Sequence, residues 1–291
     1  ILADIANTAG SRAGAGLQTV NITGAGAYAY RVTFEPGWGG TLSKVKVDTS
    51  TLQEIPPAPW QVGGGKDVTA PPDSLYAQLT PTVAKPEPWY TARNIVTLHT
   101  EGTAIPFLFD DLSAARQDAL APGKPTRGLQ VLEYLRGSAE NEGSATLNFR
   151  KRTSPLGDIV DASPKYVGPP NLPYQEFADP GYSAFVASKT SRAPMVYAAV
   201  NDGMLHAFSD ADGTEKFAYV PRALFRTSEQ GGLAALTLKE AALPPFQHHF
   251  YVDSTPKVVD VDFGSQNWHS ILVGGLGKGG HAYYALDVPD P

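Results

Sequence analysis

An internal repeat limits the folds open to this chain more than any other feature of its sequence. The segment VDASPKYV at residues 160–167 matches VDSTPKVV at residues 252–259, at an offset of 92 residues. A segment that recurs in this way indicates a repeated structural unit, and neighbouring units stack so that each buries an apolar face of the next. The repeat therefore predicts two equivalent strands, one in each of two stacked units.

Each copy is followed by the pattern of a β-hairpin, in which two apolar segments flank turn residues. The predicted hairpin strands are residues 195–200 and 204–208 in the first copy and residues 270–274 and 281–287 in the second. A further turn follows each hairpin, at 210–213 and 288–291, and insertions at about 175–190 and 226–248 explain the long offset. Repeated units of four short strands are typical of the blades of a β-propeller.

The residues before the repeat have β patterns as well. Strands are predicted at residues 27–34, 42–47, 94–100 and 105–109, and a surface loop rich in proline and glycine at 54–73. In the hairpins of the repeat, apolar side chains are expected between the blades, namely Val196, Leu205, Leu272 and Tyr284. These patterns predict an all-β fold.

One stretch, residues 112–137, interrupts the β pattern. Ser113 can cap a short helix, and Thr126 can cap a second helix that ends at Gly137. We interpret 112–137 as a two-helix insertion in the β domain. Elsewhere, we expect a helix only near 233–242.

Composition supports a β-rich domain and excludes several other classes of protein. The chain has 29 glycines and 25 prolines among 291 residues, and only 18% of its residues are charged. A hydrophobic content of 42% with a net charge of −6 excludes a disordered chain and argues against nucleic-acid binding, which needs a basic surface. No apolar run reaches the roughly 20 residues of a transmembrane helix. The chain has no cysteine, which excludes disulfides and thiolate metal sites.

Three blocks of sequence resemble motifs of the PilY1 family, whose members are type IV pilus tip-associated biogenesis factors and adhesins of Gram-negative bacteria. The blocks are SPLGDIV with SPKYVG (154–168), VNDGMLHAF with FAYVP (200–221) and LVGGLGKGG with YALDV (272–288). The segment YLRG at 134–137 fits as well. The resemblance is close over about 90–291 and looser over 28–60.

The resemblance implies that residues 1–291 are part of one modified β-propeller domain, with an incomplete set of blades in this chain. It implies a non-enzymatic protein that promotes pilus assembly, opposes retraction and supports surface attachment and twitching motility. Its implied partners are minor pilins, the pilus machinery and host or abiotic surfaces, and its implied location is extracellular, at the pilus tip and outer membrane. Members of the family bind calcium in a loop that follows the stretch matching 285–288. Its ligands are therefore expected beyond residue 291, and we predict no calcium site in this chain. Because the chain begins at Ile1 without a signal-peptide pattern, we expect it to be part of a longer protein.

We predict no catalytic, cofactor-binding or metal-binding residue in this chain. Asp210, Asp212 and Gly213 resemble a calcium loop only faintly, because the glycine falls two positions too early, and a β-turn explains them better. Asp260 and Asp262 share one face of a predicted strand, which we interpret as a solvated face.

Two further segments are interpreted without a functional role. The glycine-rich run at 274–280 lacks the strand–turn–helix context of a phosphate loop and reads as a hairpin turn. Arg136-Gly137-Ser138 stands where related proteins often carry an acid after the glycine, so the serine removes the integrin-type tripeptide.

The six histidines lack the convergent spacing of a metal site. They are His99, His206, His248, His249, His269 and His281. His248 and His249 are adjacent, so on a strand they are expected to point to opposite faces. His206 and His281 occupy equivalent positions in the two hairpins, which suggests a repeated structural hydrogen bond. We therefore expect His206→Gln to be tolerated.

A quinoprotein-dehydrogenase-like propeller enzyme is the alternative function, because hairpins of that class also resemble Asn201-Asp202-Gly203 with His206-Ala207-Phe208. That class commonly carries a vicinal cysteine pair at its quinone site, which this chain lacks. A third interpretation is a scaffold propeller for outer-membrane assembly. A calcium loop beyond residue 291 favours the pilus protein, and repeated tryptophan-docking motifs favour the enzyme.

Overall fold

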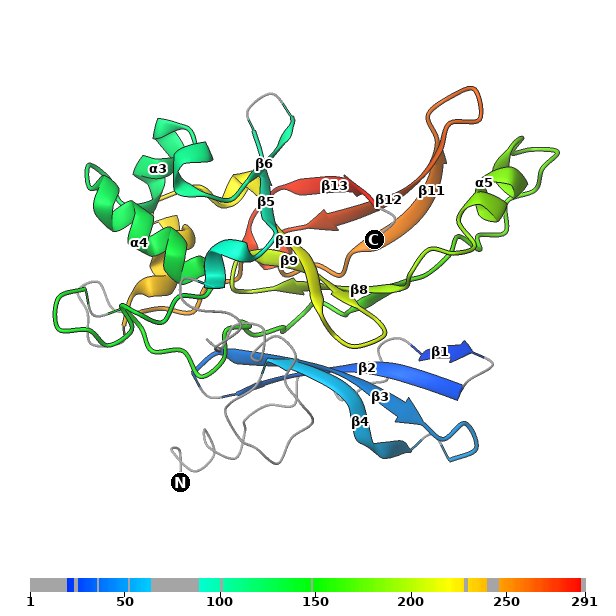
Figure 1. The fold of residues 1–291 in the computed structure, drawn as a ribbon, viewed down its shortest axis with the longest axis horizontal. Coiled ribbons are helices and arrows are strands. Elements are labelled where there is room, and N and C mark those ends of the chain that lie inside the picture. Colours follow the sequence, from blue (N-terminus) through cyan, green and yellow to red (C-terminus); the bar gives the residue numbers. More distant parts are fainter. Residues whose placement is uncertain are drawn as a thin grey trace.

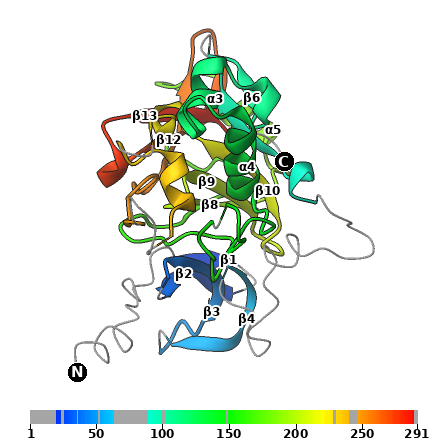
Figure 2. The ribbon, with the colours of Figure 1, turned by 90° about the vertical axis from the view of Figure 1, so that its left-hand side faces the viewer.

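The strands of this chain form three open sheets, with no closed propeller among the described residues (Figures 1 and 2). The computed structural model describes residues 20–23, 26–35, 37–51, 53–63, 89–99, 102–147, 149–227, 230–239 and 246–288. The described residues form mostly β-strands, together with some helices. No helix in these ranges is long and apolar enough to cross a membrane.

The first sheet is an antiparallel meander at the bottom of Figure 1. Its strands are β1 (Val20–Thr23), β2 (Gly26–Glu35), β3 (Gly39–Val47) and β4 (Glu54–Gly63). The predicted strands at 27–34 and 42–47 are confirmed. The prediction of a surface loop at 54–73 is wrong for residues 54–63, because they form β4. Residues 64–73 lie outside the described residues. Prolines are tolerated in β4 because, among the described strands, it lies at a sheet edge and pairs only with β3, and buried Trp60 and Val62 hold it to the core.

The second sheet has six strands in the order β6-β5-β10-β9-β8-β7. They are β5 (Ile95–Leu98), β6 (Ala104–Pro106), β7 (Lys165–Val167), β8 (Met195–Val200), β9 (Met204–Ser209) and β10 (Glu215–Val220). Strands β7 to β10 form a four-stranded antiparallel unit, and β5 joins β10 in parallel. The strand predicted at 105–109 is shorter than expected, because Phe109 begins a 3-10 turn, η2 (Phe109–Asp111).

The third sheet contains β11 (Lys257–Asp262), β12 (Trp268–Gly275) and β13 (Tyr283–Asp287) in that order. Strand β11 begins 92 residues after β7, so the repeat does mark equivalent strands. The residues of the repeat that precede each strand are irregular, and the two copies touch each other. The backbone N–H of Asp161 donates to Asp253 Oδ1 over 3.3 Å, and that of Ser163 donates to Thr255 Oγ1 over 2.8 Å.

The two helices predicted within 112–137 are confirmed as α3 (Ala114–Leu120) and α4 (Pro125–Arg136), which lie together over one end of the strands (Figure 2). Ser113 occupies the predicted N-cap position of α3, but its side chain makes no capping bond. The prediction that Thr126 caps the second helix is wrong, because Thr126 lies inside α4, whose N-cap is Lys124. Pro125 explains the start of α4, because proline suits the first helical position.

Helices also occur outside the predicted places. The expectation of helices only at 112–137 and near 233–242 is wrong, because α5 (Tyr182–Ser188) lies in the first insertion. The Glu176 carboxylate caps α5 by accepting from the N–H groups of Gly181 and Ser183, over 2.6 and 3.0 Å. The remaining short 3-10 turns are η1 (Trp89–Ala92), η3 (Arg222–Leu224), η5 (Leu233–Thr237) and η6 (Gly277–Gly279).

One hydrophobic core joins all three sheets. The four apolar side chains expected between blades are buried in it, and they are Val196, Leu205, Leu272 and Tyr284. The rings of Tyr219 on β10 and Tyr284 on β13 lie 5.2 Å apart, so they pack the second sheet against the third. This packing is the physical equivalent of two stacked units, each covering an apolar face of the other.

Replacing Leu272 by alanine should lower the free energy of unfolding by about 2–5 kcal/mol, because it leaves a cavity in this shared core. Leu272 is fully buried in β12. The neighbouring residue, Val273, is 39% exposed on the opposite face of the same strand, so Val273→Ala is the matched control. Urea unfolding of both variants tests the prediction. Equal midpoints for the two variants would show that the sheets do not depend on this contact.

Candidate functional site

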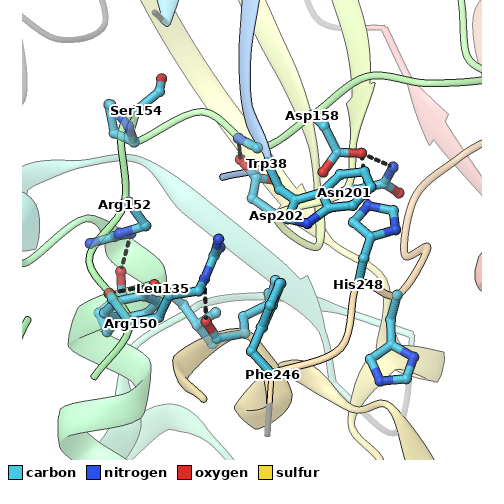
Figure 3. Close-up of a pocket in the computed structure, with 15 residues that line it drawn as sticks. Trp38, Leu135, Arg150, Arg152, Ser154, Asp158, Asn201, Asp202, Phe246 and His248 are labelled. Carbon is cyan, nitrogen blue, oxygen red and sulfur yellow. Dashed lines mark hydrogen bonds and ion pairs between the residues drawn. The ribbon is translucent and has the colours of Figure 1, made fainter. Parts of the chain in front are cut away.

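A small polar site lies where the N-terminal sheet meets the second sheet (Figure 3). The turn between β2 and β3, the segment at 150–158, the turn between β8 and β9, and the segment at 246–249 converge on it. The cavity measures only about 20 Å³, which is close to the space of one water molecule. The side chains around it therefore contact one another directly.

Asp158 is the centre of this site. Its Oδ2 accepts from Asn201 Nδ2 over 2.8 Å and lies 3.0 Å from His248 Nε2. Asn201 in turn accepts the backbone N–H of Tyr251 through Oδ1, over 2.9 Å. The indole of Trp38 covers the group by stacking on His248, with ring centroids 3.7 Å apart. The carboxylate is buried, so these bonds compensate for the loss of hydration.

Trp38 reaches this position through a strained turn. Its φ is 62°, in the left-handed region that is uncommon for a bulky residue. Next to it the backbones pack closely, because Gly40 donates its N–H to Leu156 O over 2.9 Å. A Cβ atom on Gly40 would lie 2.0 Å from the carbonyl oxygen of Gly157. The turn between β2 and β3 is therefore held tightly against the second sheet.

A chain of alternating charges continues from the site into the sheet. His206 Nε2 lies 3.0 Å from Asp202 Oδ2, and His206 Nδ1 lies 2.7 Å from Glu215 Oε1. Arg93 ends this row of charges with two hydrogen bonds to the Glu215 carboxylate, over 2.7 and 2.8 Å. Burial alone would lower the pKa of His206, but Asp202 and Glu215 outweigh it and raise that pKa to about 9. Burial would also raise the pKa of Glu215, yet Arg93 and His206 hold it well below its usual range.

Arg136 lies next to this row of alternating charges and is also buried. Its guanidinium donates to the backbone carbonyl oxygens of Tyr90, Thr91, Arg93 and Phe107, over 2.7–3.1 Å. Burial, followed by the nearby Arg93, lowers the pKa of Arg136 to about 10. The Arg136-Gly137-Ser138 segment is therefore part of the interior, and the arginine is not available to a partner.

The two arginines of the basic run at 150–152 are also structural. Arg150 donates to the carbonyl oxygen of Gly37 over 2.8 Å and lies over the ring of Phe246. Arg152 pairs with Glu142, with Nε and Oε1 2.6 Å apart. These two arginines line the cavity, yet their donors are committed to protein acceptors.

The aspartates singled out from the sequence have structural partners. Asp210 and Asp212 lie in a turn closed by Gly213, as predicted. Asp210 Oδ2 also pairs with Lys44 Nζ over 2.8 Å, and its carbonyl oxygen accepts from Trp60 Nε1 over 2.9 Å, so this turn fastens the N-terminal sheet.

The expectation of a solvated face at Asp260 and Asp262 is wrong for Asp260. Its carboxylate is buried and accepts from Tyr182 and Ser270. Asp262 is exposed and caps the following turn by accepting the backbone N–H of Gly264. Residues from the unexpected helix α5 therefore cover half of the predicted face.

The expectations for the histidines need correction as well. His206 and His281 do not share a structural role, because His206 is buried on β9 whereas His281 is exposed in the turn before β13. His248 and His249 do not point to opposite faces of a strand, because they lie in an irregular segment and both line the cavity. The partners that define these roles are far away in the sequence, so spacing alone could not reveal them.

The polar groups of this site bond mainly to one another. No serine or threonine hydroxyl in the described part of the chain is hydrogen-bonded to His206 or His248. Within the same ranges, no group of three or more histidine or acidic residues could hold a metal ion. The side chains bind each other and connect segments that are distant in the sequence.

Residues 156–291 match the family model described as the PilY1 beta-propeller domain. Through them the chain belongs to the PilY1 family. The chain is 30% identical over 281 residues, 91% of its length, to the type IV pilus biogenesis factor PilY1 of Pseudomonas aeruginosa strain UCBPP-PA14. Over 57% of its length it is 44% identical to PilY1 of strain PAO1, and over 56% it is 40% identical to a PilY1 homolog of Xylella fastidiosa.

The chain spans only about a fifth of the UCBPP-PA14 PilY1, 21% of its length, and 14% and 13% of the other two relatives. Among solved structures, the crystal structure of the Pseudomonas aeruginosa PilY1 C-terminal domain is 38% identical, with a TM-score of 0.30. That match covers 43% of this chain and 22% of the crystallised chain.

Proposed function

We propose that this chain is part of a type IV pilus biogenesis factor that acts by binding rather than by catalysis. The observation that carries the proposal is the alignment of 91% of the chain with a PilY1 protein of Pseudomonas aeruginosa. The polar site supports a non-enzymatic role, since its charged groups neutralise one another inside the fold. The parent protein promotes pilus assembly, opposes retraction and supports surface attachment and twitching motility.

The same proposal assigns partners and a location. The parent protein acts with minor pilins and the pilus machinery, contacts host or abiotic surfaces, and lies outside the cell at the pilus tip and outer membrane of a Gram-negative bacterium. The support is the relatives' description as type IV pilus biogenesis factors. A net charge of −6 gives the chain no general affinity for nucleic acid.

For the fold, we propose that residues 1–291 are part of one modified β-propeller with an incomplete set of blades. Strands β7 to β10 form one four-stranded unit, and β11 to β13 correspond to its first three strands. A strand equivalent to β10 would pair with the outer edge of β13. The outer face of the third sheet exposes Val259, Val273 and Tyr283, which a following blade would cover.

The function is tested by complementing a strain that lacks the gene. We expect the strain to lose surface pili and twitching, and the intact gene or the Val273→Ala form to restore both. The Leu272→Ala form should restore neither, because its protein level falls. If the protein opposes retraction, blocking retraction should return pili to the strain without the gene. Normal piliation in that strain would contradict the proposal.

Calcium added to this chain alone is expected to find no tight site, because the ligands of the intact protein are proposed to lie beyond residue 291. Calcium takes six to eight oxygen ligands, and the described residues offer no suitable acidic group. Calorimetry of the isolated chain is the measurement. A submicromolar calcium site that Asp212→Ala abolishes would overturn the expectation and would indicate that the turn at 210–213 binds calcium.

A further inference from the structure

A second, larger cavity lies between the first strands of the two repeats. It measures about 200 Å³ and is lined by β7, the segment at 168–172, Arg192 and residues of β11 and β12. Unlike the site around Asp158, it leaves room for a small molecule. A cavity with a few fixed polar groups is the usual form of a small-ligand site.

Three polar side chains line this cavity although each is nine-tenths or more buried. Arg192 is 6% exposed, Asp260 5% and Ser270 2%. They form a continuous row, in which Arg192 Nη1 donates to Ser270 Oγ over 2.9 Å and Ser270 Oγ donates to Asp260 Oδ1 over 2.6 Å. Tyr182 of α5 donates to the other oxygen of Asp260 over 2.7 Å. The polar wall of the cavity is therefore held rigidly before any ligand arrives.

Lys165 adds a positive charge that no described residue neutralises. It lines the cavity at the start of β7, and its ammonium makes no hydrogen bond or ion pair in the described part of the chain. The charges of Arg192 and Asp260 balance each other across Ser270, so Lys165 leaves the lining with a net charge of +1. Lys257 stands at the equivalent start of β11 and also lacks a described partner.

We propose that this cavity binds a small hydroxylated carboxylate of the size of a sugar ring, such as a uronic acid residue. Lys165 pairs with the carboxylate, and the hydroxyls exchange hydrogen bonds with Asn171, Ser270 and Asp260. Asp260 gives the site its selectivity. Its carboxylate accepts from ligand hydroxyls, which a uronic acid carries on several carbons and a phosphate dianion does not, so the site prefers the hydroxylated carboxylate.

The test uses the 291-residue chain and sodium D-glucuronate, followed by backbone amide NMR. We expect glucuronate to shift amide signals of the non-proline residues in 165–172 and 258–270. D-glucose lacks the charge, acetate lacks the ring and inorganic phosphate lacks the ring with its hydroxyls, so each should bind more weakly. Lys165→Gln should weaken glucuronate binding about tenfold, the effect of losing one charge-assisted contact. Lys151→Gln is the matched control, because Lys151 is exposed and outside the cavity.

Urea unfolding of both variants shows whether each is as stable as the original chain, so that lost binding is not confused with lost folding. Phosphate binding as tight as glucuronate binding would overturn the proposal, since it would indicate a general anion site. Absence of glucuronate-dependent shifts at millimolar concentration would overturn it as well. So would a Lys165→Gln variant that binds glucuronate as the original chain does.

Discussion

Arg136→Met should leave the chain unable to fold stably. Methionine has a similar length but no donor, so the carbonyl oxygens of Tyr90, Thr91, Arg93 and Phe107 lose their hydrogen bonds to the guanidinium. Hydrogen bonds to a charged group are worth about 1.5–3 kcal/mol each. The expected loss is therefore at least about 4 kcal/mol, against a total stability of about 5–15 kcal/mol for a typical domain. Soluble yield and the urea midpoint are the measurements.

Two further variants make this result specific. Arg136→Lys keeps the charge but cannot reach carbonyl groups on several sides at once, so its stability should fall between those of the original chain and Arg136→Met. Arg127→Met lies on the same helix and removes only a cation–π contact with Phe149, which is worth about 1 kcal/mol or less. If Arg136→Met unfolds at the same urea concentration as Arg127→Met, the carbonyl cluster does not hold the fold together.

The second large effect is a loss of stability at alkaline pH. The pKa of His206 is about 9 in the folded chain, above its unfolded value of 6.5. A raised histidine pKa stabilises the fold fully below pH 6.5, and this contribution is lost as the pH rises to about 9. The shift corresponds to roughly 3 kcal/mol. Urea midpoints measured from pH 6 to pH 9.5 should therefore fall across this interval.

His206→Gln tests the same row of alternating charges directly. The sequence led us to expect that this change is tolerated, but glutamine carries no charge and leaves Asp202 and Glu215 without the cation between them. Breaking a buried ion pair costs about 3–5 kcal/mol, so the variant should be much less stable at pH 6. At pH 9.5 the original chain has also lost this charge, and the difference should shrink. An equally steep alkaline decline in the variant would assign the effect to another group.

Local patterns in the sequence predicted those elements whose geometry depends on neighbours in the chain. The strands around Asn201-Asp202-Gly203 and the end of α4 at Gly137, whose φ is 124°, are examples. In these places alternation of apolar residues or a glycine is enough to choose the backbone conformation. The repeat identified β7 and β11 as equivalent strands because the same short sequence precedes and begins both of them.

Elements that depend on distant partners could not be predicted in this way. Strand β4 forms despite its prolines because one edge of it pairs with β3. Helix α5 is stabilised by Glu176 and by the contact of Tyr182 with Asp260. The sequence around 182–188 contains the helix, but nothing in it shows that a buried carboxylate on β11 is its partner.

The sequence by itself determined the hairpins, the two-helix insertion, the repeat and the resemblance to the PilY1 family. Only the tertiary structure decided the roles of the charged residues. Asp158 and His248 are 90 residues apart, and Arg93 and Glu215 are 122 apart, yet each pair is in hydrogen-bond contact. The reason is physical: local backbone preferences act over a few residues, whereas a buried charge is stabilised by whichever opposite charge the completed fold brings beside it.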